Sequence, residues 1–300
     1  MNNFGEELKN VRDVWKCGHR RVEFSDGGKI VGILNVTPDS FSDGGCHADA
    51  AGAITHGLAL WRAGAAILDV GGESTRPGAQ PVQAPVELAR VIPVIEGLRA
   101  AAPDLVLSVD TSKAEVAREA IAAGADIIND VTGLTGDPLM AEVVAQAGSG
   151  VVIMHMRGTP ATMQEAPSYW DVVREVRSFL EEQCAFALRS GIKAEQIVLD
   201  PGIGFGKNLE HNLTLLRHIG ELRVAGRPLM LGVSRKSLFH RLLGAERADL
   251  EGLTAACTGL ARTHGVLLHR VHDVRASLLA LRLAEAMLPT GEFHCASANQ

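Results

Sequence analysis

The regular part of this chain opens with a short apolar run, Lys29-Ile30-Val31-Gly32-Ile33-Leu34, which ends at the polar Asn35. Further runs of the same kind follow at intervals along the chain, at 65–70, 105–109, 125–128, 150–154, 196–199, 228–233 and 265–271. Nearly unbroken apolar strands are typical of parallel sheets that are covered on both faces. The eight runs therefore predict eight buried parallel strands.

Stretches rich in Ala, Leu, Glu and Arg separate these runs and have helical period, at 48–63, 85–101, 113–123, 138–147, 170–189, 210–224, 250–263 and 274–288. Several are followed by a glycine that can end a helix, at Gly64, Gly124, Gly191 and Gly265. Eight strand–helix units with right-handed crossovers close most simply into a (β/α)8 TIM barrel, an α/β fold with one domain. An open doubly wound sheet is the alternative that the same alternation permits.

Composition excludes several classes of protein. Of the 300 residues, 46% are hydrophobic and 21% charged, as in a globular domain. The net charge of −6 argues against a non-specific nucleic-acid binder, and no apolar run is long enough to cross a membrane. Five scattered cysteines form no C-x-x-C pair, and the N-terminal residues have no signal-peptide pattern. We therefore expect a cytoplasmic protein without nucleic-acid or membrane partners.

The barrel domain is expected to span residues 29–288. Residues 1–28 form an N-terminal extension, within which 20–24 are expected to pair as a short strand across the bottom of the barrel. Residues 289–300 are expected to form a flexible C-terminal tail.

Polar or charged residues end every predicted strand, where the active site of such a barrel lies. They are Asn35, Glu73-Ser74-Thr75-Arg76, Asp110, Asn129, His155, Asp200, Ser234-Arg235-Lys236-Ser237, Arg270 and His272. One such residue can be a helix cap, but capping does not explain all of them, since several precede their helices by many residues. The pattern predicts a single site at the barrel mouth.

The charges at this mouth are mixed. Asp110, Asn129 and Asp200 offer acceptors that suit the N–H donors of an aminopyrimidine edge. Arg270 and His272 are two residues apart on the last strand, near the position where such barrels bind phosphate. No His/Cys cluster has zinc spacing, so Mg²⁺ is the expected ion if one is used with a phosphorylated substrate.

Two loops suit a binding site. Residues 37–45 form a long polar loop with the composition of a mobile lid, although an ordered surface turn is the alternative. Residues 202–207 are glycine-rich but lack the spacing of a dinucleotide or Walker motif. They are interpreted as a flexible loop that carries Phe205 and Lys207 over the site.

Taken together, these motifs resemble the dihydropteroate synthase family, and the resemblance covers about residues 29–288. The matching segments are 32–45 (GILNVTPDSFSDGG), 72–78 (GESTRPG), 108–111 (SVDT), 128–131 (INDV), 154–156 (MHM), 200–207 (DPGIGFGK), 234–237 (SRKS) and 270–273 (RVHD).

The resemblance implies a (β/α)8 barrel, usually a homodimer, that acts as a transferase in folate biosynthesis. Such an enzyme joins dihydropterin-methyl diphosphate to 4-aminobenzoate with Mg²⁺, giving dihydropteroate and diphosphate, and is a sulfonamide target. Its partners are thus small-molecule substrates.

The resemblance also implies roles for individual residues. Asp110, Asn129, Asp200 and Lys236 would hold the pterin edge, with Met154 and Gly206 among the substrate contacts. Asn35 would contact the metal, and Arg270 and His272 would bind the diphosphate. Thr75, Arg76, Pro77 and Phe41 would build the 4-aminobenzoate subsite, with Phe205 and Ser237 on its ring and carboxylate. Asp110, Lys236, Arg270 and His272 are the expected catalytic residues.

Departures from the family pattern are small and remove no assigned residue. They are Ser112, Leu238-Phe239-His240 and His269. A pterin-binding methyltransferase that serves a corrinoid protein is one alternative, but it has no need of the diphosphate clamp at Arg270 and His272. A non-catalytic pterin- or folate-binding protein is the other, but it would be expected to have lost some of the charged mouth residues.

Overall fold

The computed structural model describes residues 13–37 and 46–288 and confirms the barrel. Its eight parallel strands are β3 (Lys29–Asn35), β4 (Ile67–Gly71), β5 (Val106–Asp110), β6 (Ile127–Asp130), β7 (Gly150–Met154), β8 (Ile197–Asp200), β9 (Met230–Gly232) and β10 (Leu268–Val271). They pair in the order β8-β7-β6-β5-β4-β3-β10-β9. A parallel bridge between Leu199 and Leu229 joins the two outer strands, so the sheet closes on itself. The open-sheet alternative is therefore excluded.

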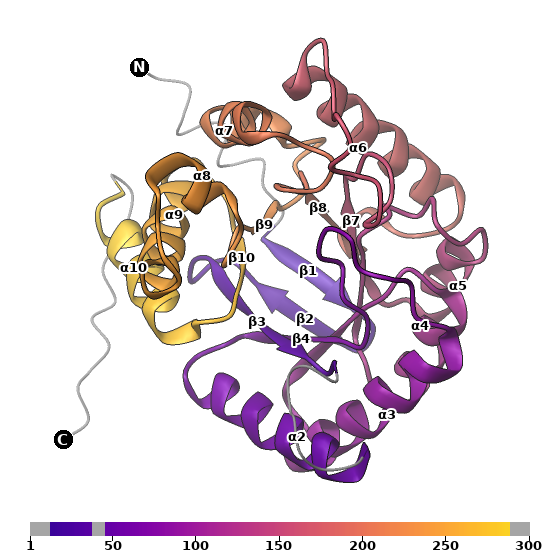
Figure 1. Cartoon of the computed structure of the whole chain (residues 1–300). Helices are drawn as coiled ribbons and strands as arrows, with labels where there is room; N and C mark the ends of the chain where they lie inside the picture. Colours follow the sequence, from indigo (N-terminus) through magenta and orange to yellow (C-terminus); the bar gives the residue numbers. More distant parts are fainter. Residues whose placement is uncertain (1–12, 38–45, 289–300) are drawn as a thin grey trace, which may run out of the picture.

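The helices surround this barrel as a ring (Figure 1). They are α2 (Cys46–Arg62), α3 (Ala84–Ala101), α4 (Ala114–Ala122), α5 (Met140–Ala147), α6 (Val172–Arg189), α7 (Leu209–Arg217), α8 (Leu238–Leu243), α9 (Leu250–Thr263) and α10 (Val274–Ala286). Gly64, Gly124, Gly191 and Gly265, which follow four of these helices, all have positive φ, as expected of helix-ending glycines.

One helical expectation needs correction, and one helix was missed. The stretch 210–224 is not one helix, because His218 leaves helical geometry and a 3₁₀ turn, Ile219–Leu222, follows α7. The His218 side chain bonds instead to Glu221, with 2.8 Å between Nδ1 and Oε1. The short helix α8 was not predicted at all, since six residues are too few to show a helical period.

The alternation of side chains along each strand divides the interior into two environments. One face of each strand points outward and builds the large core against the helices, as Leu34, Leu68 and Leu107 do. The lower inward positions are also apolar, including Val31, Ile67 and Leu268. The upper inward positions are mostly polar, although Ile33 and Met154 also line the cavity there. The apolar lower and outer layers therefore stabilise the barrel, and the residues of the upper layer are available to bind a ligand.

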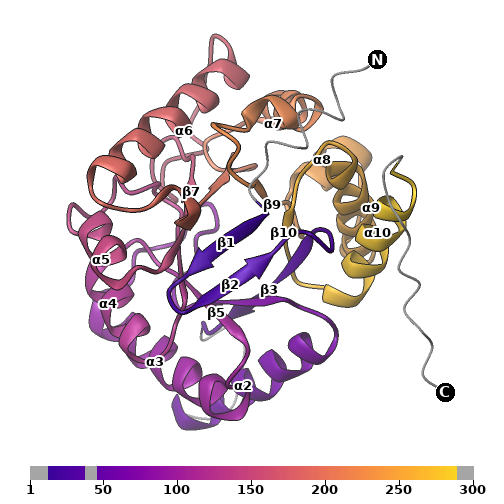
Figure 2. The same cartoon turned by 180° about the vertical axis from the view of Figure 1, so that it is seen from behind.

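An antiparallel hairpin covers the lower end of the barrel, as Figure 2 shows. It consists of β1 (Val14–Cys17), which was not predicted, and β2 (Arg20–Glu23), which corresponds to the short strand expected at 20–24. Trp15 is buried in the lower layer, and its Nε1 donates to the carbonyl of Gln196 at 2.7 Å. A Cβ on Gly150 would lie 2.9 Å from Cys17 Sγ, so glycine there permits this close approach.

We expect Trp15→Ala to lower the free energy of unfolding by about 3–5 kcal/mol, because it opens a cavity and removes the bond to Gln196. Urea unfolding followed by circular dichroism measures this change. Trp170→Ala is the matched control, since Trp170 is fully exposed. Equal stabilities of the two variants would show that the hairpin does not contribute to barrel stability.

Candidate active site

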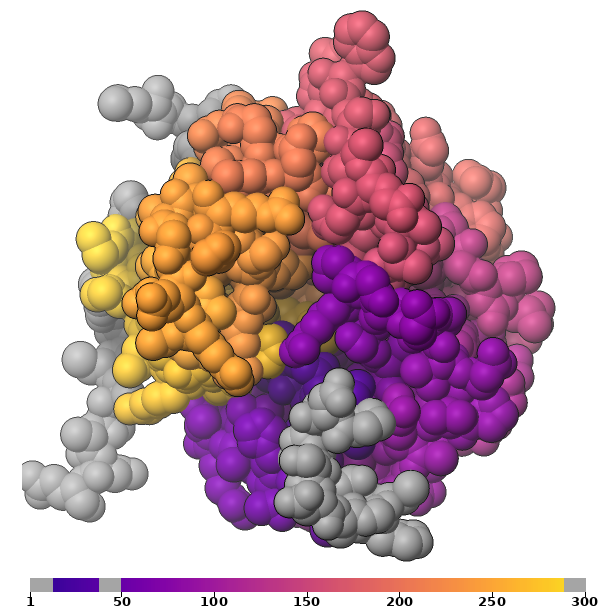
Figure 3. All heavy atoms as spheres, viewed as in Figure 1, coloured from indigo at the N-terminus to yellow at the C-terminus, as the bar shows by residue number. Residues whose placement is uncertain are grey.

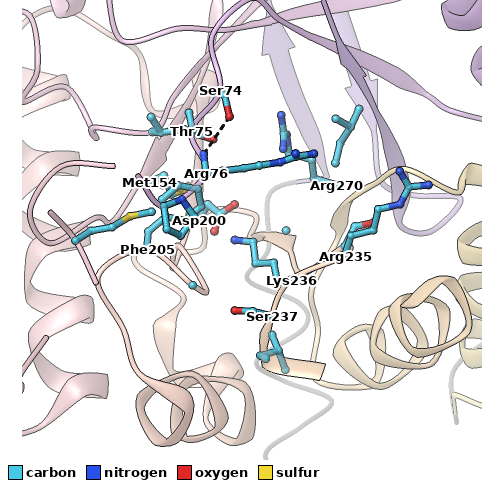
Figure 4. Close-up of a pocket in the computed structure, with 18 of the residues that line it drawn as sticks. Ser74, Thr75, Arg76, Met154, Asp200, Phe205, Arg235, Lys236, Ser237 and Arg270 are labelled. Atoms are coloured by element: carbon cyan, nitrogen blue, oxygen red, sulfur yellow. Dashed lines mark hydrogen bonds between the residues drawn. The ribbon is translucent and has the colours of Figure 1, made fainter. Parts of the chain in front are cut away.

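A cavity of about 700 Å³ opens at the carboxyl ends of the strands. Figure 3 shows the face opposite the hairpin, which is hollowed near its centre, and Figure 4 shows the residues inside. The predicted site residues that line the cavity are Asn35, Glu73, Ser74, Thr75, Arg76, Pro77, Asp110, Asn129, Met154, Asp200, Phe205, Lys207, Ser234, Arg235, Lys236, Ser237, Arg270 and His272. Its volume suits a small organic substrate.

Three expectations differ from this picture or lie outside it. Gly206 does not line the cavity; its φ of +64° and its closeness to the Arg157 carbonyl make it a turn residue. His155 lies outside the cavity, buried against the Phe179 ring with 4.9 Å between centroids. Phe41, like most of the loop 37–45, lies outside the described residues.

The cavity floor is an ionic network centred on Arg270 of β10. Its Nε donates to Asp69 Oδ2 at 2.6 Å, and its Nη2 donates to Asp110 Oδ2 at 2.8 Å. Asp69 Oδ2 also accepts from Asn129 Nδ2 at 2.9 Å. Asp69 was missed by the sequence reasoning, although a carboxylate inside the apolar run 65–70 was a visible signal.

This network leaves a set of buried acceptors without partners. Oδ1 of Asp110 and Oδ1 of Asn129 make no hydrogen bond with any described residue. Burial raises the pKa of Asp110 to about 7, with Arg270 opposing the rise and Asp69 adding to it. Since an unsatisfied buried acceptor costs about 1–3 kcal/mol, a ligand that brings N–H donors is favoured here.

Asp200 and Lys236 form the adjoining wall. Asp200 accepts from Gly202 N at 2.7 Å, and burial raises its pKa. Lys236 donates to the carbonyl of Ile203, and its Nζ lies 4.3 Å from the centroid of the Phe205 ring. Burial lowers the pKa of Lys236 to about 8, although Asp200 opposes the fall. The wall therefore combines an acceptor, a cation and an aromatic face.

The loop that carries Phe205 is tied down, which corrects the expectation that it is flexible. Lys207 is almost fully buried, and its Nζ donates to the carbonyls of Gly202 at 2.9 Å and Phe205 at 3.0 Å. His155 Nδ1 lies 2.8 Å from the same nitrogen. Although Lys207 reaches the cavity wall, the hydrogen bonds of its Nζ hold the loop in shape, and burial lowers its pKa well below the usual value.

His272 follows directly after β10 and faces Ser234, with 2.9 Å between Nδ1 and Oγ. Burial lowers its pKa to about 3, and the charges of Arg235 and Arg270 add to the fall. The imidazole is therefore neutral at pH 7. A neutral ring whose Nδ1 accepts from Ser234 presents Nε2–H as a donor for an anionic ligand.

The segment with Thr75 and Arg76 is held from behind by Lys113, which the sequence reasoning also missed. Lys113 Nζ bonds to Glu73, and it lies 2.5 Å from Oε2 of the fully buried Glu87. Arg90 adds a 2.7 Å bond to the carbonyl of Gly72. The signal was weak in the sequence, because the partners come from different strand–helix units.

At the mouth of this closed barrel, buried acceptors lie beside arginine and lysine side chains. This combination indicates a barrel enzyme that binds an aminopyrimidine-type ring together with an anion. The family model described as "Pterin binding enzyme" matches residues 31–272. Dihydropteroate synthase of Escherichia coli strain K12 is 48% identical over 263 residues, which is 88% of this chain and 93% of the relative.

Solved structures agree. The dihydropteroate synthase of Xanthomonas albilineans with 4-aminobenzoic acid has a TM-score of 0.85 and 45% identity, and the match covers 93% of this chain and 100% of that one. The Yersinia pestis dihydropteroate synthase with a sulfonamide drug has a TM-score of 0.84 and 42% identity, covering 91% and 98%. The chain belongs to the pterin-binding enzymes and, within them, to the dihydropteroate synthase family.

We expect Lys113→Met to destabilise the protein by about 3 kcal/mol at pH 7, because it leaves the buried Glu87 without its cation. Urea unfolding measures the loss. The double variant Lys113→Met/Glu87→Met removes both charges and should recover most of the stability. A double variant as unstable as the single one would mean that Lys113 acts through packing alone.

Proposed function

We propose that this chain condenses (7,8-dihydropterin-6-yl)methyl diphosphate with 4-aminobenzoate to 7,8-dihydropteroate and diphosphate. The observation that carries the proposal is the pair of unpartnered acceptors, Asp110 Oδ1 and Asn129 Oδ1, beside Arg270. These acceptors match the donor edge of a pterin, and the nearby cations match a diphosphate. The resemblance to dihydropteroate synthases supports the same reaction.

The reaction needs no covalent enzyme intermediate in this mechanism. The bond between the exocyclic methylene carbon and the diphosphate oxygen breaks, and its electron pair leaves with the diphosphate. Arg270 and His272 bind that developing charge, while the Asp110 carboxylate stabilises the cationic pterin. The amine nitrogen of 4-aminobenzoate then forms the new C–N bond and loses a proton to solvent.

The residues present fit a Mg²⁺ ion at Asn35. Its side-chain amide lines the cavity at the end of β3 and makes no hydrogen bond with a described residue. Among residues 13–37 and 46–288, no cluster of three or more His, Cys, Asp or Glu side chains could hold a metal. Since Mg²⁺ typically takes few protein ligands and adds substrate phosphates and water, one amide oxygen is consistent with it. When bound, Mg²⁺ would neutralise charge on the diphosphate oxygens.

The methyltransferase and the non-catalytic binding protein are less well supported. Both would use the acceptors of Asp110 and Asn129, but neither needs an anion-binding pair at the last strand. The Arg270 cation and the neutral His272 line the same cavity as Asp110. Within residues 13–37 and 46–288, no helix is both long and apolar enough to cross a membrane. Cys17, Cys184 and Cys257 are free thiols, which is consistent with the cytoplasmic location that we propose.

The decisive measurement is release of diphosphate and formation of dihydropteroate from dihydropterin diphosphate, with and without 4-aminobenzoate and Mg²⁺. We expect stoichiometric products only when all three are present. Asp110→Asn should lose about two decades of turnover, because it removes the charge that stabilises the cation, while the fold, followed by circular dichroism, stays intact. Tight pterin binding without product would favour one of the two alternatives, and unchanged turnover in Asp110→Asn would refute the role of this carboxylate.

We also propose a homodimer that forms through α9 and α10, which lie side by side (Figures 1 and 2). Leu260 on α9 and Leu279 and Leu283 on α10 are 65%, 55% and 64% exposed, and Met287, just after α10, is 76% exposed. An apolar patch of this kind on a folded domain marks an interaction surface. A two-fold dimer would bury the same patch on both copies.

We expect Leu279→Glu/Leu283→Glu to convert the dimer to a monomer, because it places charges in an apolar interface. Sedimentation velocity measures the mass. Leu188→Glu, at a leucine of α6 that is 44% exposed, is the control and should leave the dimer intact. A wild-type monomer at micromolar concentration would refute the proposal.

A further inference from the structure

Two of the cations that line the cavity have no partner within the described part of the chain. Arg270 is paired with Asp69 and Asp110, and Arg235 donates to Glu251 at 2.6 Å. Lys236 and Lys207 donate to loop carbonyls. The guanidinium groups of Arg76 and Arg241 make no such bond to a described residue, although both residues line the cavity. An unpaired guanidinium facing a cavity is available to an anion that the ligand supplies.

Arg241 lies on the short helix α8, on the wall that Ser237 begins. Its backbone N–H donates to the carbonyl of Ser237 at 3.0 Å, so the two residues are one helical turn apart and share a face. Leu238 of the same turn also lines the cavity. In Figure 4, Ser237 lies on the opposite side of Lys236 from Arg270. The wall of Arg241 is therefore separate from the diphosphate-binding residues of β10.

The two substrates of the proposed reaction carry two different anions. The diphosphate must lie near Arg270 and His272, where the leaving charge develops. The amine of 4-aminobenzoate must face the pterin above Asp110, and its ring suits the Phe205 face beside Lys236. Because the carboxylate is para to the amine, it points away from the pterin, toward the wall of Ser237 and Arg241.

We propose that Arg241 is a specificity-determining residue that pairs with the carboxylate of 4-aminobenzoate. The proposal rests on the proposed function and extends it to a residue of α8 outside the motifs that support that function. Arg241 recognises the full negative charge of the carboxylate on the second substrate. It therefore favours the substrate over ring compounds of the same shape whose para group is neutral, including the simplest sulfonamide, 4-aminobenzenesulfonamide.

The test compares a charged and a neutral second substrate in the same variant. We expect Arg241→Gln to raise the KM for 4-aminobenzoate about fivefold, which corresponds to a well-placed exposed ion pair, with kcat little changed. The KM for 4-aminobenzamide and the inhibition constant of 4-aminobenzenesulfonamide should stay within twofold of the wild type. Arg241→Lys keeps the charge without the bidentate geometry, so its KM for 4-aminobenzoate should lie between those of the wild type and Arg241→Gln.

Arg118→Gln is the matched control, because Arg118 lies on α4 outside the cavity and the variant changes the net charge by the same amount. It should leave every constant unchanged. The KM for dihydropterin diphosphate is measured in all variants.

Each other outcome overturns the assignment in a distinct way. An equal rise in KM for the acid and the amide would assign Arg241 to packing against the ring. A rise for dihydropterin diphosphate alone would assign it to the diphosphate, and no change would remove it from the site. A wild-type chain that makes no dihydropteroate would overturn the proposed function itself, and with it the substrate assigned to Arg241.

Discussion

The pairing of Arg270 with Asp69 and Asp110 is the interaction on which the site depends. A guanidinium inside a barrel is tolerated because two carboxylates bond to it, at 2.6 and 2.8 Å. Asp69 in turn orients Asn129 by accepting from its amide nitrogen. As a result, the free acceptors of Asp110 and Asn129 are held in place before any ligand arrives. A site that is organised in advance loses less entropy on binding and stabilises charge without rearranging.

The layers of the barrel separate stability from chemistry. The lower layer, with Trp15 and the inward apolar residues, excludes water and supports the strands from below. The polar layer above it lowers the stability of the fold unless each buried charge is paired, because burying an unpaired charge costs free energy. The loops depend on a second set of buried contacts, namely the ion pair of Lys113 with Glu87 and the hydrogen bonds of Lys207 to loop carbonyls. Polar groups that never touch the substrate therefore support those that do.

Much of this arrangement could be predicted from the sequence, because its signals are local. Each apolar run corresponds to a strand of the barrel. Polar residues at the ends of these runs, such as Asn35, Asp110 and Asp200, line the cavity at the mouth. What escaped prediction depends on contacts between distant segments. His155 has the same sequence signal as Asp200, but it packs against Phe179 and Lys207 instead of facing the cavity. Asp69, Lys113 and Arg241 carry charges whose partners or directions follow only from closure of the barrel.

The hairpin at the lower end also covers that end of the barrel, so it limits where a ligand can enter. With β1 and β2 across the bottom, the cavity has its opening at the carboxyl ends of the strands (Figures 2 and 3). Asp110 is buried at the floor of the cavity, whereas Ser237 is exposed on its outer wall. Among the described residues the inner position therefore lies behind the outer one, so the depth of the cavity favours binding of the inner ligand first.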